Sequence, residues 1–158
     1  MFLTLHAAVG ALIGEEVSSP TLAFVLGFIF HFVLDLIPHG DEDLVKGYQD
    51  GARIKRMVSV ATVDAIVMAI LFFIFYSQDF FFQPKVVIWG ITGSIFPDFL
   101  IGVHEITKIK ILDKFHDLHY FAHNFFFERF HLSFTKGLIV QLSIIIAIGF
   151  FLLSYFFV

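Results

Sequence analysis

A histidine and an aspartate, His31 and Asp35, lie four residues apart near the end of the apolar stretch 21–38. On a helix, this spacing places both side chains on one face, one turn apart. The stretch is long enough to be a membrane helix, and ionisable groups inside a bilayer are costly unless they are paired, hydrated or bound to an ion. A bound metal ion is the sharpest explanation for this pair, and a hydrogen bond within or between helices is the alternative.

The residues that follow are suited to turn the chain back over this pair. Pro38 and Gly40 end the helix. We therefore expect His39 and Asp41 to lie near its last turn. His39 is a candidate metal ligand, with a loop contact as the alternative. Asp41 is a candidate base, although it begins an acidic run that also suits a solvated turn or a helix cap.

Three further histidines lie close together after the fourth apolar stretch. On a helix, His116, His119 and His123 occupy an arc of about 60°, at about 100° per residue. Phenylalanines flank this arc, so the helix is suited to lie in the membrane interface. Neutral imidazole is the commonest ligand for zinc and also suits iron and nickel. The arc predicts a metal-binding face, and an ordinary aromatic interfacial helix is the alternative.

The composition indicates one integral membrane domain. The chain has 158 residues, of which 58% are apolar, and its mean hydropathy is +0.88. Soluble domains are less apolar, and a chain of this length forms one domain. The net charge of −4 and the lack of a basic stripe argue against a nucleic-acid partner. Because the chain has no cysteine, only His, Asp or Glu side chains are available to hold a metal.

The apolar stretches predict an all-α fold, a polytopic transmembrane helix bundle. We expect four full transmembrane helices, one short N-terminal membrane helix over residues 2–14, and an amphipathic His-rich interfacial helix. The four full helices are expected over residues 21–38, 57–77, 86–103 and 137–158.

Basic residues set the expected orientation. Nearly all of them lie in the loops 39–56 and 104–136. The positive-inside rule therefore places both loops in the cytoplasm, beneath a prokaryotic-type inner or plasma membrane. Polar residues with separate structural roles would not be expected to lie at the same depth in the membrane. We therefore predict that the ionisable residues form one pocket in the cytoplasmic half of the membrane. The ionisable residues that this path places there are His6, His31, Asp35, Asp64 and Asp98.

Small residues continue the spacing of these polar residues. Strips of small residues are where membrane helices approach one another closely. We therefore expect the polar side chains to point into the bundle and away from lipid. The three strips, each spaced by four residues, are His6–Gly10–Gly14, Gly27–His31–Asp35 and Gly90–Ser94–Asp98.

Together these motifs resemble the predicted membrane-bound, metal-dependent hydrolases, a family of small polytopic proteins loosely akin to zinc-dependent phospholipase C. The resemblance covers most of the chain. In two places the chain departs from the family: Leu100 stands where a second acidic residue is often found, and Tyr120, Phe121 and Asn124 replace the usual residues around the loop histidines. The matching motifs are His6-Ala-Ala-Val-Gly10, His31-xxx-Asp35-xx-Pro38, Pro97-Asp98 and His119-Tyr-Phe-Ala-His123-Asn124.

The resemblance implies a hydrolase of a phosphoester, with a lipid as the expected substrate. We expect one or two divalent metal ions, zinc first and manganese as the alternative. A carboxylate outside the ligand set, Asp64 or Asp41, would take a proton from water. Lys55, Arg56 or Arg129 would hold the phosphate. The expected metal ligands are His6, His31, Asp35, His39, Asp98, His116, His119 and His123.

Other functions fit the same residues. A metal-ion or proton transporter or channel also has Asp and His inside the membrane, but its pathway should be polar in both halves, and the outer half here is poor in polar residues. Paired histidines are also haem ligands, and a metal would equally pin the helices of a non-catalytic scaffold. We interpret His104, Glu105 and His131 as ordinary interfacial residues. The sequence does not indicate the oligomeric state.

Overall fold

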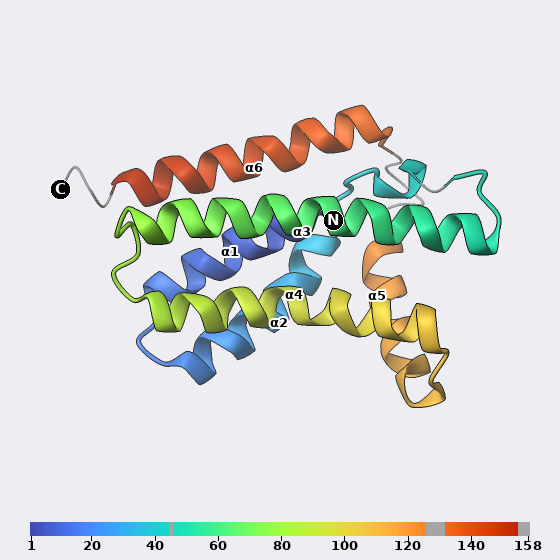
Figure 1. Cartoon of the computed structure of the whole chain (residues 1–158), viewed down its shortest axis with the longest axis horizontal. Helices are drawn as coiled ribbons and strands as arrows, with labels where there is room; N and C mark the ends of the chain where they lie inside the picture. Colours follow the sequence, from blue (N-terminus) through green and yellow to red (C-terminus); the bar gives the residue numbers. More distant parts are fainter. Residues whose placement is uncertain (45, 126–131, 155–158) are drawn as a thin grey trace.

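Helices make up the regular structure of the described residues, 1–44, 46–125 and 132–154, in the computed structural model (Figure 1). The all-α expectation is confirmed for this part of the chain. The connections include two short 3₁₀ turns, η1 (Asp41–Leu44) and η2 (Lys110–Leu112). The α-helices are α1 (Leu3–Glu16), α2 (Pro20–Asp35), α3 (Asp50–Ser77), α4 (Pro84–Thr107), α5 (Asp113–Asn124) and α6 (Phe134–Ser154).

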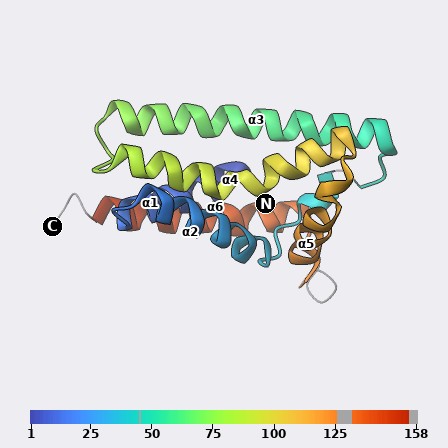
Figure 2. The ribbon, with the colours of Figure 1, turned by 90° about the horizontal axis from the view of Figure 1, so that it is seen from below.

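The three longest helices, α3, α4 and α6, run in roughly the same direction along the length of the molecule (Figures 1 and 2). They have 28, 24 and 21 residues, and each is long and apolar enough to cross a membrane. These helices indicate a membrane protein. α2 has 16 residues, fewer than the ~20 that a full crossing takes. A fourth full crossing therefore stays a prediction.

Local sequence explains several helix ends. The hydroxyl of Ser19 accepts a hydrogen bond from the N–H of Leu22 at 3.4 Å, and Pro20 takes the first position of α2, where a missing N–H is tolerated. α3 begins at Asp50 and not at residue 57, because the intervening Ala, Arg and Lys residues are good helix formers. After α2 the chain turns at Gly40, whose φ of 70° favours glycine.

Glycines let α1 and α2 pack directly against the backbone of α4. A Cβ atom added at Gly10 or Gly27 would lie 2.5 Å from the carbonyl oxygen of Gly90. A Cβ atom at Gly93 would clash with the carbonyl oxygen of Phe24. Helices approach this closely only through small residues. The predicted strips are therefore confirmed as contact surfaces between these three helices.

The predicted loops gather at one end of the bundle. In Figure 1, helix α5 and the turn after α2 lie at the end where α3 begins and α4 ends. The α1–α2 and α3–α4 connections lie at the opposite end. This arrangement agrees with the expectation that the two basic loops share one side of the membrane. That this side faces the cytoplasm stays a prediction.

Candidate metal centre

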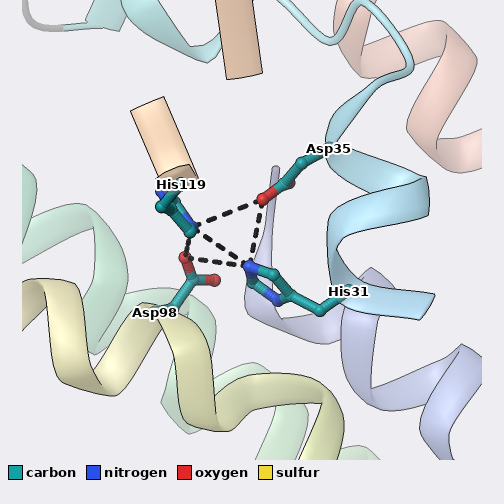
Figure 3. A group of neighbouring side chains, drawn as sticks. All are labelled: His31, Asp35, Asp98 and His119. Carbon is teal, nitrogen blue, oxygen red and sulfur yellow. Dashed lines mark hydrogen bonds and ion pairs between the residues drawn. The ribbon is translucent and has the colours of Figure 1, made fainter. Parts of the chain in front are cut away.

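Four side chains from three helices converge where α2, α4 and α5 meet (Figure 3). One nitrogen or oxygen atom from each lies within 4.8 Å of those of the others. His31 Nε2 is 3.0 Å from Asp35 Oδ2 and 3.1 Å from His119 Nε2. His119 Nε2 is also 3.2 Å from Asp98 Oδ1. We call His31, Asp35, Asp98 and His119 the central cluster.

The backbone of α4 fixes the orientation of the His31 ring. His31 Nδ1 lies 2.7 Å from the carbonyl oxygen of Ser94. Because a carbonyl oxygen only accepts, Nδ1 carries the proton and donates it. The lone pair of Nε2 then faces the central cluster, as in most metal-ligating histidines. Since Ser94 belongs to the small-residue strip of α4, the close helix packing also makes this hydrogen bond possible.

His6 of α1 also reaches the central cluster. Its ring stacks on that of His31, with centroids 4.1 Å apart. His6 Nε2 lies 3.2 Å from Asp35 Oδ1 and 3.9 Å from Asp98 Oδ2. Both ring nitrogens of His6 and Oδ2 of Asp35 are buried without a hydrogen-bond partner among the described residues. Buried polar atoms are nearly always satisfied, and a cation bound among these atoms would supply the partner that they lack.

Asp35 also faces a second group of possible ligands, formed with His39 and His123. His123 Nε2 lies 3.1 Å from Asp35 Oδ2. His39 Nδ1 donates a hydrogen bond to the carbonyl oxygen of Ile37 at 2.7 Å, and its Nε2 contacts the amino nitrogen of Met1 at 3.0 Å. In this arrangement His39 therefore lies beside the central cluster, and Asp35 is shared by both groups.

Two histidines outside the long helices are held in the neutral form. Burial lowers the pKa of His119 below its usual value. Burial, together with the neighbouring amino group of Met1, lowers the pKa of His39 to about 3. The neutral imidazole is the form that binds a metal ion.

The geometry and charge of the central cluster fit a divalent metal ion. Two ligands bound tetrahedrally at about 2.0–2.1 Å lie about 3.3 Å apart. The corresponding separations among His31, Asp35 and His119 are 3.0, 3.1 and 3.4 Å. The carboxylates of Asp35 and Asp98 together carry two negative charges, and the side chain of Asp35 is fully buried. The amino group of Met1 lies 3.5 Å from Asp35 Oδ1 and offsets part of this charge. One divalent cation would balance both carboxylates, which are costly at this position when they are unpaired.

The two carboxylates predicted as bases lie outside the central cluster. Asp64 of α3 accepts hydrogen bonds from the hydroxyl and, at 3.3 Å, the N–H of Thr4. It therefore attaches α3 to α1. Asp41 accepts a hydrogen bond from Gln141 Nε2 at 2.9 Å, and its Oδ2 lies 4.0 Å from His39 Nε2. Asp41 thus lies at the margin of the site.

The structure divides the predicted arc of loop histidines. His119 and His123 face Asp35. His116 lies in a different group, with its Nε2 3.1 Å from Oε1 of Glu105. The helix α5 runs past the end of α4, so successive turns of α5 meet different partners.

The basic residues predicted to hold phosphate lie away from the central cluster or outside the described residues. The Arg56 side chain donates to the carbonyl oxygen of Leu44 and, at 3.2 Å, to the hydroxyl of Tyr48. Lys55 is exposed on α3. Arg129 and His131 lie outside the residues that the structure describes.

One organising residue escaped the sequence analysis. Gln141 of α6 is 1% exposed. Its amide nitrogen donates to Asp41 and, at 3.3 Å, to the carbonyl oxygen of His39, while its amide oxygen accepts from the N–H of Phe2 at 2.9 Å. A lone amide within an apolar helix was the signal that could have identified it, because such groups seek polar partners inside a bundle.

Comparison with known proteins assigns no family to this chain. No protein-family model, no curated protein and no solved structure matches it.

Proposed function

We propose that this protein is a membrane-embedded, divalent-metal-dependent hydrolase that acts on a phosphoester, with a membrane lipid as the expected substrate. The observation that carries the proposal is the central cluster, where two imidazoles and two carboxylates from three helices converge. The buried atoms of His6 and Asp35 that lack a hydrogen-bond partner among the described residues also support a bound cation. The resemblance of the sequence motifs to membrane-bound metal-dependent hydrolases points to the same reaction class.

In this proposal, His31, Asp35, Asp98 and His119 hold the metal. When bound there, a divalent cation would lower the pKa of water towards ~7 and would polarise a phosphoryl oxygen. The side chains of Asp98 and His123 are 22% and 19% exposed, whereas those of His31 and Asp35 are fully buried. The substrate therefore approaches past Asp98 and His123.

A base is also required to take the proton from the attacking water. His123 Nε2 lies 3.1 Å from Asp35 Oδ2 and is not needed as a ligand of the first metal ion. Asp41 lies further out, where Gln141 holds its carboxylate. We propose His123 or Asp41 for this role, and we place Asp64 third because Thr4 already occupies its carboxylate.

The donor set bears on the choice of metal. The two imidazoles and two carboxylates of the central cluster would hold zinc. The two carboxylates would also suit manganese, which favours oxygen ligands. Zinc remains our first choice because imidazole is its commonest ligand, and manganese is the alternative.

We further propose that the site opens at the cytoplasmic face of a prokaryotic-type inner or plasma membrane. All Lys and Arg residues except Lys85 lie in the loops 39–56 and 104–136. Positive residues concentrate on the cytoplasmic side of membrane proteins. The position of α5 and the turn after α2 at one end of the bundle supports this assignment (Figure 1).

Elemental analysis of detergent-purified protein tests the metal site. We expect the wild type to carry at least one equivalent of metal, and the His31→Ala/Asp35→Ala variant to carry one equivalent less. Preparations made without chelator and reloaded with zinc or manganese exclude loss during purification. A reloaded wild type that holds no more metal than the double variant would overturn the proposal.

Hydrolysis of a panel of phospholipids and soluble phosphoesters by metal-loaded protein in detergent tests the activity. We expect release of a phosphorylated headgroup or of phosphate from at least one lipid, and none from the double variant.

A non-catalytic scaffold is the second candidate, because four protein donors are typical of structural zinc. A protein with a bound metal and no turnover on any phosphoester would favour the scaffold.

A further inference from the structure

A second group of possible metal ligands lies where α4 ends and α5 begins. It consists of His104 and Glu105 from the last turn of α4 and His116 from α5, each offering a ligand atom within 4.8 Å of the others. The rings of His104 and His116 have centroids 4.6 Å apart. None of these residues belongs to the central cluster. We call this group the corner cluster.

The local fold explains why these residues meet. Lys108, which follows α4, has a φ of 52°, so the helix ends there in a left-handed turn. The short η2 turn follows, and α5 begins at Asp113. This sharp reversal brings the first turns of α5 against the last turn of α4. His104 Nε2 consequently lies 3.0 Å from Asp113 Oδ1.

The hydrogen bonds of His104 leave one nitrogen ready to bind a cation. A carboxylate only accepts hydrogen bonds, so His104 Nε2 donates to Asp113 and the neutral ring keeps its lone pair on Nδ1. His104 Nδ1 is buried and has no hydrogen-bond partner among the described residues. The residue is 8% exposed. A histidine whose second nitrogen donates to a carboxylate has the usual arrangement of a metal ligand.

The carboxylate of Glu105 is oriented in the same way. Its Oε1 lies 3.1 Å from His116 Nε2, and its Oε2 accepts a hydrogen bond from Lys108 Nζ at 2.6 Å. Lys108 thus binds one carboxylate oxygen of Glu105, and the other oxygen faces His116. The side chains of Glu105 and His116 are 26% and 30% exposed, so a cation from solvent has access to them.

We propose that the corner cluster is a second divalent-cation site, at which His104, Glu105 and His116 hold a zinc ion. Two imidazoles and one carboxylate are a ligand set that zinc uses. Asp113 orients His104 and is a positioning residue. The role of this site is structural: it fixes α5 against the end of α4, and α5 carries His119 into the central cluster. The site depends on no residue of the proposed hydrolase centre.

Zinc content after chelation, reloading with Zn²⁺ alone and desalting tests this site. The Glu105→Gln/His116→Asn variant should hold one equivalent less than the wild type, and Lys114→Gln, an exposed change on the same helix, should match the wild type. The Asp113→Asn variant should bind this zinc about 10- to 100-fold more weakly, the usual loss for a residue that orients a ligand. Equal zinc content in the wild type and the Glu105→Gln/His116→Asn variant would overturn the proposal.

Limited proteolysis of the wild type tests the site without relying on a variant's folding. Trypsin cleaves after Lys108, Lys110 and Lys114, all at this corner. Adding Zn²⁺ to chelated wild type should slow cleavage there, and it should also do so in the His31→Ala/Asp35→Ala variant. Unchanged cleavage of the wild type would overturn the corner site. A wild type that binds zinc at the corner cluster but not at the central cluster would instead contradict the hydrolase proposal.

Discussion

Gly10 of α1 and Gly90 of α4 touch through their backbones: a Cβ atom at Gly10 would lie 2.5 Å from the Gly90 carbonyl oxygen. His6 lies one turn before Gly10, and Asp98 lies two turns after Gly90. The glycine contact therefore fixes the distance between the two helices that carry these side chains. A separation larger by one methyl group would move His6 away from Asp98.

The variant Gly10→Ala should destabilise the protein by about 1–3 kcal/mol, because the added methyl meets backbone atoms that cannot move aside. The matched control is Gly102→Ala in α4, where an added Cβ meets nothing within 4 Å. The control should be neutral or stabilising, since alanine favours a helix over glycine. Thermal unfolding in detergent measures both. An unchanged melting temperature for Gly10→Ala would contradict the close packing of α1 on α4.

The variant Asp98→Asn should separate a catalyst from a scaffold. It keeps the shape of the side chain but removes one of the two charges that balance the metal, so metal affinity should fall at least tenfold and hydrolysis should be lost. Asp98 is partly exposed, and the neutral amide of asparagine can replace its 3.2 Å contact with His119. The melting temperature without metal should therefore change little. Asp117→Asn, an exposed change on α5, is the control and should alter neither metal content nor turnover.

The sequence predicted much of the central cluster because its information is local. His31 and Asp35 are four residues apart on one helix, and the small-residue strips indicate which faces of α1, α2 and α4 meet. The depth of Asp98 followed from its position in an apolar stretch. These features depend only on helical periodicity and helix length.

Other parts depend on long-range geometry that periodicity does not contain. The arc of His116, His119 and His123 was predicted, but not that α5 passes the end of α4 and sends His116 to Glu105. The depth of Asp64 matches the pocket, yet the packing of α3 directs its carboxylate to Thr4. The residue pattern of a helix indicates how deep a side chain lies in the membrane and on which face of the helix it lies. Which neighbouring residues that face contacts depends on how the helices cross.

The variant Gln141→Leu should loosen α6. Gln141 is buried and binds Asp41, the carbonyl oxygen of His39 and the N–H of Phe2. Leucine would remove these three hydrogen bonds, and leaving a buried polar group unsatisfied costs about 1–3 kcal/mol. The control is Ser143→Ala, since the exposed Ser143 donates to the carbonyl oxygen of Ile139 in its own helix and to no other helix among the described residues. Thermal unfolding of the two variants should differ accordingly, and equal melting temperatures would contradict the role of Gln141.

Chelation should destabilise the protein through the central cluster, because it leaves the carboxylates of Asp35 and Asp98 close together with only the amino group of Met1, 3.5 Å from Asp35 Oδ1, to offset their charge. The experiment uses the Glu105→Gln/His116→Asn background, so that the corner cluster does not contribute. Metal at a hundred times its dissociation constant stabilises the folded state by about 2.7 kcal/mol, and chelator should abolish this gain. Adding the His31→Ala/Asp35→Ala changes to the same background should remove the response to metal and chelator. Among the described residues, the central cluster is the one group of possible ligands that includes His31. A response that persists would therefore place the bound ion elsewhere in the protein.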